Sequence, residues 1–433
     1  MSDASLFRSF MGNLAVSNAD DISTKYESIT TRLNKDFWDS DSETAHTLQI
    51  GSYGRYTAID GVSDLDMAFS IPKSKYDHYK SLGKDGPKAM LDEVRESLKK
   101  RYDKTKIKVD GQIVGVFFSN YHVEVLPSYE DANGDFWHGD TNSGEFKLTK
   151  PRPEIKAVNN LNNETSGNLK DCCRMLRQWK NQVGVGMGGL LIDTLTYNFF
   201  IEHDDYDSAT YKDYPQMLVS LFAYLGGLDE QDYWMAPGSN QRVRCKTNFQ
   251  SKAQRAATRC QEAIDATSES AKVKLWKKVF GRKFPAAATS AMAMESLREG
   301  LSLSFDQEQF VEERFGLDVR YSLEVEAELR EGTYVSDRLR QSLRRRERVP
   351  VGRHLRFYVT ECDVPKPYAI AWKVRNQGQI ATDRKMLRGE ITFDKDGLEQ
   401  RYETADFSGD HYVEAYAIKD GVCVARGKIK VPI

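Results

Sequence analysis

The chain is poor in the residues that build zinc sites and disulfide frameworks. It has 6 cysteines and 7 histidines among 433 residues, and no two cysteines form a Cys-x-x-Cys pair. No cluster of cysteine and histidine shows the spacing of a zinc site. We therefore expect reduced thiols, and the adjacent Cys172 and Cys173, which fall within a helical pattern, are interpreted as structural.

Long hydrophobic runs are missing as well. No apolar stretch approaches the roughly 18–20 residues that a membrane-spanning helix needs. The start, Met1-Ser2-Asp3-Ala4, lacks the basic-then-apolar pattern of a signal peptide. These absences favour a soluble, cytoplasmic protein.

The sequence has no excess of charge of either sign. Its 62 basic residues nearly balance its 64 acidic residues, which leaves a formal net charge of −2. Net charge therefore gives no argument for wholesale binding to nucleic acid or to a membrane surface. The length predicts about two to three domains and is ample for a sizeable core.

The most informative stretch is a glycine turn followed by an acidic strand. Gly51-Ser52-Tyr53-Gly54 precedes Asp64-Leu65-Asp66-Met67, where polar and apolar residues alternate. In a strand, Asp64 and Asp66 share one face, roughly 6–7 Å apart, so both can coordinate one divalent ion. Glycine lets backbone N–H groups approach an anion, and Ser52 adds a hydroxyl donor. The arrangement suits a nucleoside triphosphate held with magnesium.

A third carboxylate is expected on a neighbouring strand. The run from His122 to Pro127 reads as a strand, and Glu124 shares a face with His122 and Leu126. If this strand pairs beside the 64–71 strand, three carboxylates converge. Without the earlier motif, Glu124 would be an ordinary glutamate on a half-buried strand.

A basic face is expected on a helix over about 168–183. Arg174 and Arg177, with Lys180 as a further candidate, lie away from the apolar stripe of this helix. Such a face is usually just solvated, but beside an acidic, magnesium-loaded pocket it can bind a triphosphate. The glycines over 184–189 are interpreted mainly as helix-packing positions.

The remaining stretches predict helices, loops and, toward the C-terminus, a change to a pattern of short β-strands. We expect one helix over 5–37 bracing the sheet, a polar, loop-like stretch over 128–165 that is either a cover over the site or a connector, and a flexible bridge over 286–293. The arginine-rich run from Arg338 to Arg348 is interpreted as a solvated linker rather than a nucleic-acid site. From Leu355 onward, five or more short strands predict a compact sandwich or barrel.

Several of these motifs together resemble a known enzyme family. The sequence over 51–59 and 63–67, together with the later Glu124, is similar to that of the bacterial cGAS/DncV-like nucleotidyltransferases of the DNA polymerase beta superfamily. Supporting matches lie over 236–239, 276–285 and 317–321. The sequence over 371–378, 387–389 and 409–414 resembles the nucleotide-sensor domain that follows the catalytic region in some of these enzymes.

The resemblance implies an α+β fold: a polymerase-beta-like nucleotidyltransferase sheet plus a helical lobe, followed by a small all-β C-terminal domain. The expected divisions are 1–165 for the catalytic core, 166–335 for the helical lobe, 336–352 for a basic linker and 353–433 for the sensor-like domain. Within the last, Trp372, Arg388 and His411 are candidate nucleotide contacts, although Trp372 is better explained as a core residue.

The resemblance also implies a function, namely synthesis of a cyclic di- or trinucleotide second messenger from ATP, and from GTP or other NTPs, in bacterial anti-phage defence (CBASS). Asp64, Asp66 and Glu124 would hold two Mg²⁺ ions, or Mn²⁺ in their place, while Gly51 and Ser52 would hold the donor triphosphate. The product would diffuse to a downstream effector. Activation by nucleic acid is disfavoured, since the Cys/His insertion of the animal relatives is missing.

The chain departs from the family pattern at three places. Glu124 stands where aspartate is commoner, and Arg177 stands near a usual lysine. The serine common near the start of the following helix is replaced within Gly188-Gly189, so its nucleotide contact is not carried over. Other functions stay open, because the same acids serve linear NTP polymerases and transferases acting on RNA or a small molecule. A non-catalytic nucleotide sensor is the alternative of a different class, and the intact set of acids argues against it.

Overall fold

The computed structural model describes residues 2–16, 19–61, 64–119, 121–286, 309, 311–332, 334–384, 386–394 and 397–433. Residues 287–293 of the bridge predicted over 286–293 lie outside these ranges. The chain divides into two compact units, with the division between residues 289 and 290. None of the helices among the described residues combines the length and the apolar character that crossing a membrane requires.

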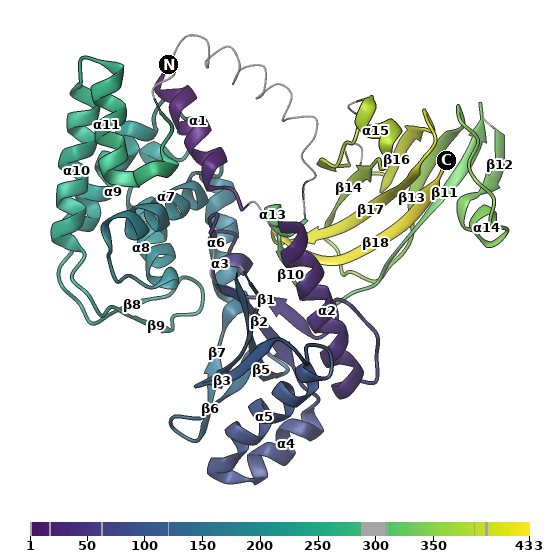
Figure 1. Cartoon of the computed structure of the whole chain (residues 1–433), viewed down its shortest axis with the longest axis horizontal. Helices are drawn as coiled ribbons and strands as arrows, with labels where there is room; N and C mark the ends of the chain where they lie inside the picture. Colours follow the sequence, from purple (N-terminus) through teal and green to yellow (C-terminus); the bar gives the residue numbers. More distant parts are fainter. Residues whose placement is uncertain are drawn as a thin grey trace. The chain divides into compact units, whose positions relative to one another are not determined.

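The first unit contains a mixed sheet (Figure 1). Its central order is β1-β2-β5-β4-β3, with β6 joined to β5 and β7 joined to β6. β2 and β5 run parallel, and the other neighbours are antiparallel. The strands are β1 (Thr47–Gln49), β2 (Asp64–Ser70), β3 (Lys106–Asp110), β4 (Ile113–Phe117), β5 (His122–Glu130), β6 (Phe136–Asp140) and β7 (Glu145–Thr149).

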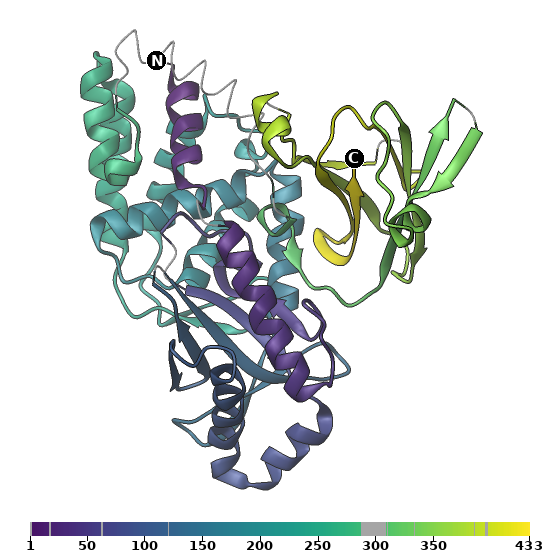
Figure 2. The ribbon, with the colours of Figure 1, turned by 45° about the vertical axis from the view of Figure 1, so that its right-hand side comes forward.

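Helices cover the sheet and form a lobe beside it. α2 and α5 pack on the face where Leu65, Met67 and Val123 are fully buried, because strand alternation directs these apolar residues to one side. In Figures 1 and 2, α9 and α10 of the lobe lie side by side. The helices are α1 (Asp3–Leu14), α2 (Ala19–Phe37), α3 (Gly51–Gly54), α4 (Lys73–Ser81), η1 (Gly83–Asp85), α5 (Gly86–Lys99), α6 (Pro151–Glu164), α7 (Asn168–Val183), α8 (Gly189–Glu202), η2 (Asp204–Tyr206), α9 (Tyr214–Gly227), α10 (Gln250–Asp265), α11 (Glu269–Phe280) and η3 (Gly281–Lys283), and the lobe also carries the hairpin of β8 (Tyr233–Met235) and β9 (Arg242–Arg244).

Two expectations for this unit are wrong. The helix predicted over 5–37 is two helices, and only α2 braces the sheet. α1 packs into the lobe instead, where Phe7 meets Trp276 edge-on at 5.0 Å between ring centroids. The connector predicted over 128–165 forms the end of β5, the β6–β7 hairpin and α6. Pro151 stands in the first turn of α6, where proline is tolerated because that N–H has no helical partner.

The second unit is a β-sandwich with a few short helices. One sheet has the order β10-β18-β17-β14-β15 and the other β12-β11-β13-β16, and their apolar faces share one core that includes Trp372. Trp372 is thus a core residue, as expected. The elements are α13 (Val311–Arg314), β10 (Gly316–Leu317), β11 (Leu323–Glu331), β12 (Tyr334–Arg338), α14 (Leu339–Arg344), β13 (His354–Cys362), β14 (Ala369–Arg375), α15 (Gln379–Asp383), β15 (Ile391–Phe393), β16 (Gln400–Thr404), β17 (Asp410–Lys419) and β18 (Val422–Pro432).

The predicted α+β class is confirmed, but the boundaries at 335 and 352 are not those of the structure. The residues expected to end the helical lobe and to form a basic linker include β11, β12 and α14, which belong to the sandwich. Two arginines of this run bond to other parts of the sandwich: Arg340 donates to the Val325 carbonyl, and Arg348 donates to the Ile433 carbonyl. The run is therefore part of the sandwich, although the side chains over 344–348 are exposed.

Candidate active site

The predicted glycine turn is a single helical turn, α3, pressed against the acidic strand. Gly51 has φ 64°, a left-handed conformation that glycine adopts without strain. A Cβ atom added to Gly51 would lie 1.8 Å from Oδ2 of Asp66, so the backbone there directly faces that carboxylate. A Cβ atom on Gly54 would lie 2.2 Å from the Gln49 carbonyl oxygen. Glycine is required at both positions, because a side chain there would collide with these oxygen atoms.

The register of two parallel strands brings the predicted acids together. Asp64 of β2 stands beside His122 of β5, and Asp66 stands beside Glu124. Leu65 and Val123, the pair between them, are fully buried on the opposite face. All four polar side chains therefore share the face away from α2 and α5, as predicted for the three carboxylates.

A histidine stands among the acids. His122 Nε2 lies 2.9 Å from Asp64 Oδ1 and 3.2 Å from Glu124 Oε1. Ligand atoms of these three residues all lie within 4.8 Å of one another, which suits one metal ion. Strand alternation predicts that His122 shares the face of Glu124, but it predicts no role for the imidazole. The signal was its position two residues before Glu124, because strand positions i and i+2 share a face.

Asp66 is the most enclosed of the acids. Its burial, and then the Glu124 carboxylate beside it, raise the pKa of Asp66 from 3.8 to about 7, although Arg55 opposes the shift. Without a cation, the folded protein therefore holds a proton on Asp66 near neutral pH. A divalent cation would supply the positive charge that this group lacks, so the residues present fit a metal site.

Asp66→Asn is expected to stabilise the metal-free protein at pH 8. Because the folded pKa is raised, stability falls as pH rises from about 4 to about 7, and the asparagine variant escapes that loss. The unfolding temperature in EDTA should exceed that of the wild type by on the order of 2–4 °C at pH 8, with the difference vanishing near pH 4. Asp110→Asn, on the exposed end of β3, is the control. An equal gain at both pH values would contradict this explanation.

Arg177 does not occupy the predicted nucleotide-binding position. Its guanidinium donates to both carboxylate oxygens of Asp193 on α8, at 2.5 and 2.9 Å, and to the Gly189 carbonyl. Arg55, which follows the glycine turn, donates to the same carboxylate at 2.8 Å, and Thr57 donates at 3.1 Å. The prediction for Arg177 is corrected: it ties α7 to α8 through Asp193, the carboxylate to which Arg55 and Thr57 tie the loop after the glycine turn.

Asp193 at the centre of this network is fully buried and charged. Burial alone would raise its pKa, but the guanidinium groups of Arg177 and Arg55 hold the pKa well below its usual range. Asp193 was not among the residues predicted from the sequence. Its signal was a lone aspartate in the apolar run Leu190–Phe200, because a carboxylate there requires a buried cationic partner.

The other basic residues of α7 differ in their burial and in the groups that they contact. Arg174 donates to the Tyr56 carbonyl at 3.1 Å and lies over the Tyr56 ring, so it also holds the loop after the glycine turn. Lys170 is buried, and burial and Arg174 lower the pKa of Lys170 to about 7. Lys180 lies half-buried in the last turn of α7. A nucleotide contact by Lys180 stays a prediction.

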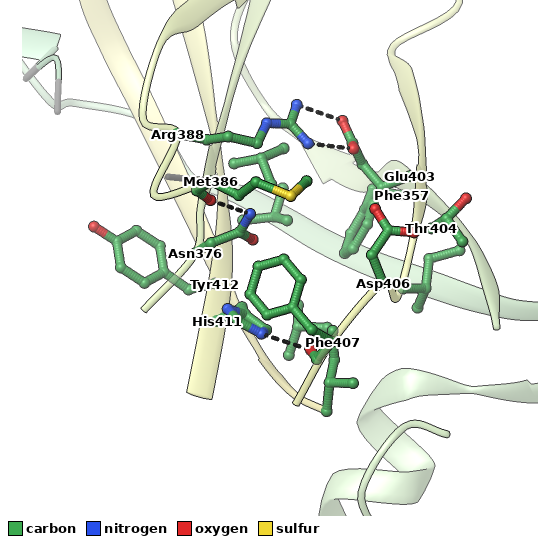
Figure 3. Close-up of a pocket in the computed structure, with 15 residues that line it drawn as sticks. Phe357, Asn376, Met386, Arg388, Glu403, Thr404, Asp406, Phe407, His411 and Tyr412 are labelled. Atoms are coloured by element: carbon green, nitrogen blue, oxygen red, sulfur yellow. Dashed lines mark hydrogen bonds and ion pairs between the residues drawn. The ribbon is translucent and has the colours of Figure 1, made fainter. Parts of the chain in front are cut away.

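The second unit has a small hollow at one end of its sandwich (Figure 3), with a cavity volume of about 40 Å³. Arg388 forms a forked ion pair with Glu403, at 2.6 and 3.1 Å, and adopts a left-handed conformation with φ 54°. His411 accepts a bond from the Gln377 N–H and approaches the Phe407 carbonyl at 3.2 Å. The wall consists of Leu355, Phe357, Val374, Asn376, Met386, Arg388, Glu403, Thr404, Asp406, Phe407, His411, Tyr412, Val413, Val431 and Ile433. Two of the three predicted sensor contacts, Arg388 and His411, line this hollow, whereas Trp372 does not.

Two known domain families match parts of the chain. Residues 1–162 match the model of the Second Messenger Oligonucleotide or Dinucleotide Synthetase domain. Residues 305–433 match that of the Adenylyl/Guanylyl and SMODS C-terminal sensor domain. These matches fall on the sheet with the acids and on the sandwich with the hollow.

Individual relatives are distant. The chain is 22% identical over 268 residues to a cyclic AMP-AMP-AMP synthase of an Acinetobacter strain, covering 57% of this chain and 75% of that protein. Among solved structures, Escherichia coli CdnC with ATP has a TM-score of 0.51 and 16% identity, covering 66% of this chain and 99% of that one. CdnC in complex with a HORMA protein has a TM-score of 0.50 and 17% identity, covering 64% and 96%. The two structures show a shared fold.

Proposed function

Because the chain belongs to the cGAS/DncV-like nucleotidyltransferases, the family of cyclic oligonucleotide synthases, we propose that it makes a cyclic di- or trinucleotide second messenger from ATP, alone or with GTP or another NTP. The observation that carries the proposal is the placement of Asp64, Asp66 and Glu124 on adjacent parallel strands, with Asp66 against the backbone of Gly51. A relative that makes cyclic AMP-AMP-AMP supports ATP as a substrate. We further propose that the product acts in bacterial anti-phage defence through a downstream effector.

The proposed reaction joins a ribose hydroxyl of one nucleotide to the α-phosphorus of another. The new O–P bond forms as the bond to pyrophosphate breaks, and the hydroxyl proton is released. Asp64, Asp66 and Glu124 would hold two divalent cations, which favour ionisation of the hydroxyl and offset the charge of the leaving group. Gly51 and Ser52 would bind the donor triphosphate through backbone N–H groups and a hydroxyl. One such joining for a dinucleotide, or two for a trinucleotide, gives a linear intermediate, and a final intramolecular joining closes the ring with release of another pyrophosphate.

Within the chain, the Asp193 network keeps these parts in position. Arg55 and Thr57 tie the loop after the glycine turn to α8, and Arg174 holds the Tyr56 carbonyl from α7. The distance between the donor triphosphate and the acids is therefore set by buried, charge-assisted hydrogen bonds. Such positioning matters because phosphoryl transfer depends mainly on alignment and charge stabilisation.

The test is incubation of the purified protein with Mg²⁺ or Mn²⁺ and all four NTPs, followed by phosphatase treatment and mass spectrometry. A phosphatase-resistant cyclic product that an Asp64→Ala variant does not form would support the proposal and give its base composition. Linear products would favour a polymerase or a transferase. Nucleotide binding without any product, in the presence of either metal, would favour a non-catalytic sensor.

We also propose that the hollow of the second unit is the ligand site of the sensor domain. Its wall is fixed in advance, because Glu403 locks the Arg388 guanidinium and Asn376 donates to the Met386 carbonyl at 2.7 Å. A non-glycine residue held in a left-handed conformation is a strained position of the kind found at binding sites. Burial lowers the pKa of His411, so its ring is neutral at pH 7.

Arg388→Ala is expected to weaken nucleotide binding to this hollow by about tenfold, because a charge-assisted, pre-oriented donor is lost. Binding of ATP and of the enzyme's own product would be measured by calorimetry in an Asp64→Ala background, so that turnover does not interfere. Arg353→Ala, on the same sandwich but outside the hollow, is the control. Equal affinities for Arg388→Ala and Arg353→Ala would contradict a role for the hollow.

A further inference from the structure

His122 is placed as a fourth polar group in the acidic site. It starts β5 directly beside Asp64 of β2, and it shares a face with Glu124 two residues later. Its Nε2 atom lies 2.9 Å from one carboxylate and 3.2 Å from the other. The nitrogen therefore lies beside both carboxylates, close enough for the three side chains to serve as ligands of one cation.

The orientation of the imidazole is supported from the next strand. Phe117 of β4 is the register partner of His122, and the two rings stack with centroids 5.0 Å apart and planes 22° apart. The His122 side chain is 24% exposed and that of Asp64 is 45% exposed, so water and ions reach the cluster. The ring is thus held with its Nε2 atom toward the acids while the site stays open.

The donor set has a chemical consequence. Oxygen ligands alone suit Mg²⁺, whereas an imidazole nitrogen favours transition-metal ions such as Mn²⁺ over Mg²⁺. Asp64, His122 and Glu124 offer two carboxylates and one imidazole with ligand atoms within 4.8 Å of one another. Asp66 remains on the side of Gly51, next to the donor triphosphate of the proposed reaction.

We propose that His122 Nε2 is a direct ligand of a divalent cation bound between Asp64 and Glu124, and that this nitrogen makes the site select Mn²⁺ over Mg²⁺. The inference rests on the proposed function only for the presence of a cation at the acids. His122 is a metal ligand in this account, and it transfers no proton in the reaction.

The test measures metal binding directly, without turnover. Mn²⁺ would be titrated into the nucleotide-free protein and followed by electron paramagnetic resonance, with Mg²⁺ as competitor. Pulsed measurements would detect the hyperfine coupling of a directly bonded ¹⁴N nucleus. The variants are His122→Ala, His122→Gln, which keeps an N–H donor between the acids, and His78→Ala on the exposed face of α4 as the matched control.

We expect a ¹⁴N coupling in the wild type and in His78→Ala, and none in either His122 variant. Mn²⁺ binding should weaken by about tenfold or more in both His122 variants, with a smaller change for Mg²⁺. Absence of the coupling in the wild type, restoration of the Mn²⁺ preference by His122→Gln, or equal losses for the two metals would overturn the inference. Nitrogen-bound Mn²⁺ in a protein that makes no nucleotide product would leave the inference standing and remove the proposed function.

Discussion

Asp64→Ala is expected to lower the rate of nucleotide incorporation by about 10³-fold or more while the protein stays folded. Charge stabilisation by a bound metal contributes several kcal/mol to a transition state, and each 1.36 kcal/mol corresponds to about tenfold in rate. The Asp64 side chain is 45% exposed, so its removal opens no cavity in the core. Incorporation would be measured with radiolabelled ATP under saturating Mg²⁺ and, separately, Mn²⁺.

The control for this experiment is Asp110→Ala, which removes a carboxylate from the exposed end of β3 in the same sheet. Its activity should match that of the wild type. Asp66→Ala should be as inactive as Asp64→Ala. Circular dichroism and unfolding temperature would confirm that each variant is folded. A folded Asp64→Ala variant with more than about a tenth of wild-type activity would contradict the proposed chemistry.

Asp193→Ala is expected to destabilise the first unit by about 3–5 kcal/mol, the usual result of leaving buried charges without their partner. Asp193 is fully buried, and the side chains of Arg55 and Arg177 around it are 5% and 9% exposed. The loss would be measured as faster amide hydrogen exchange in α7 and α8. A local measurement is needed because a chain of two units need not unfold in one step. Asp265→Ala, an exposed aspartate of α10, should change stability by no more than about 0.5 kcal/mol.

A double variant separates the charge network from simple loss of packing. Arg177→Met combined with Asp193→Leu removes one positive and one negative charge together, so its cost should be smaller than the sum of the two single changes. Additive losses would show that the two residues do not interact. If Asp193→Ala does not fold at all, the comparison of Arg177→Met with the double variant still tests the pairing.

Local alternation was enough to predict the acidic face. Asp64 and Asp66 are two apart in a strand with apolar neighbours, and Glu124 lies in a second strand of the same kind, so their faces follow from sequence. The pairing of those strands was an assumption that the structure satisfies through a parallel register of Asp66 with Glu124. The role of His122 needed the same register, because its partner Asp64 lies 58 positions earlier.

The basic residues show why the partners of the charged side chains could not be predicted from the sequence. A stripe of arginines on α7 looks the same in sequence whether it faces solvent, a phosphate or a buried carboxylate. Arg177 meets Asp193 because α7 and α8 pack together, and Arg55 joins them from a different part of the chain. The arginines near 338–348 were likewise interpreted from composition, while their partners, such as the Val325 carbonyl, are set by strand pairing.

The register of β2 against β5 limits how this sequence can change over evolutionary time. Deleting Leu65, for example, would shift every later side chain of β2 to the opposite face, turning Asp66 into the core and Met67 outward. Single-residue insertions and deletions should therefore be absent from functional homologues over 64–70 and 122–126. They should be common at the turn after Asp131, which protrudes beyond the sheet core and whose Asn133 is exposed.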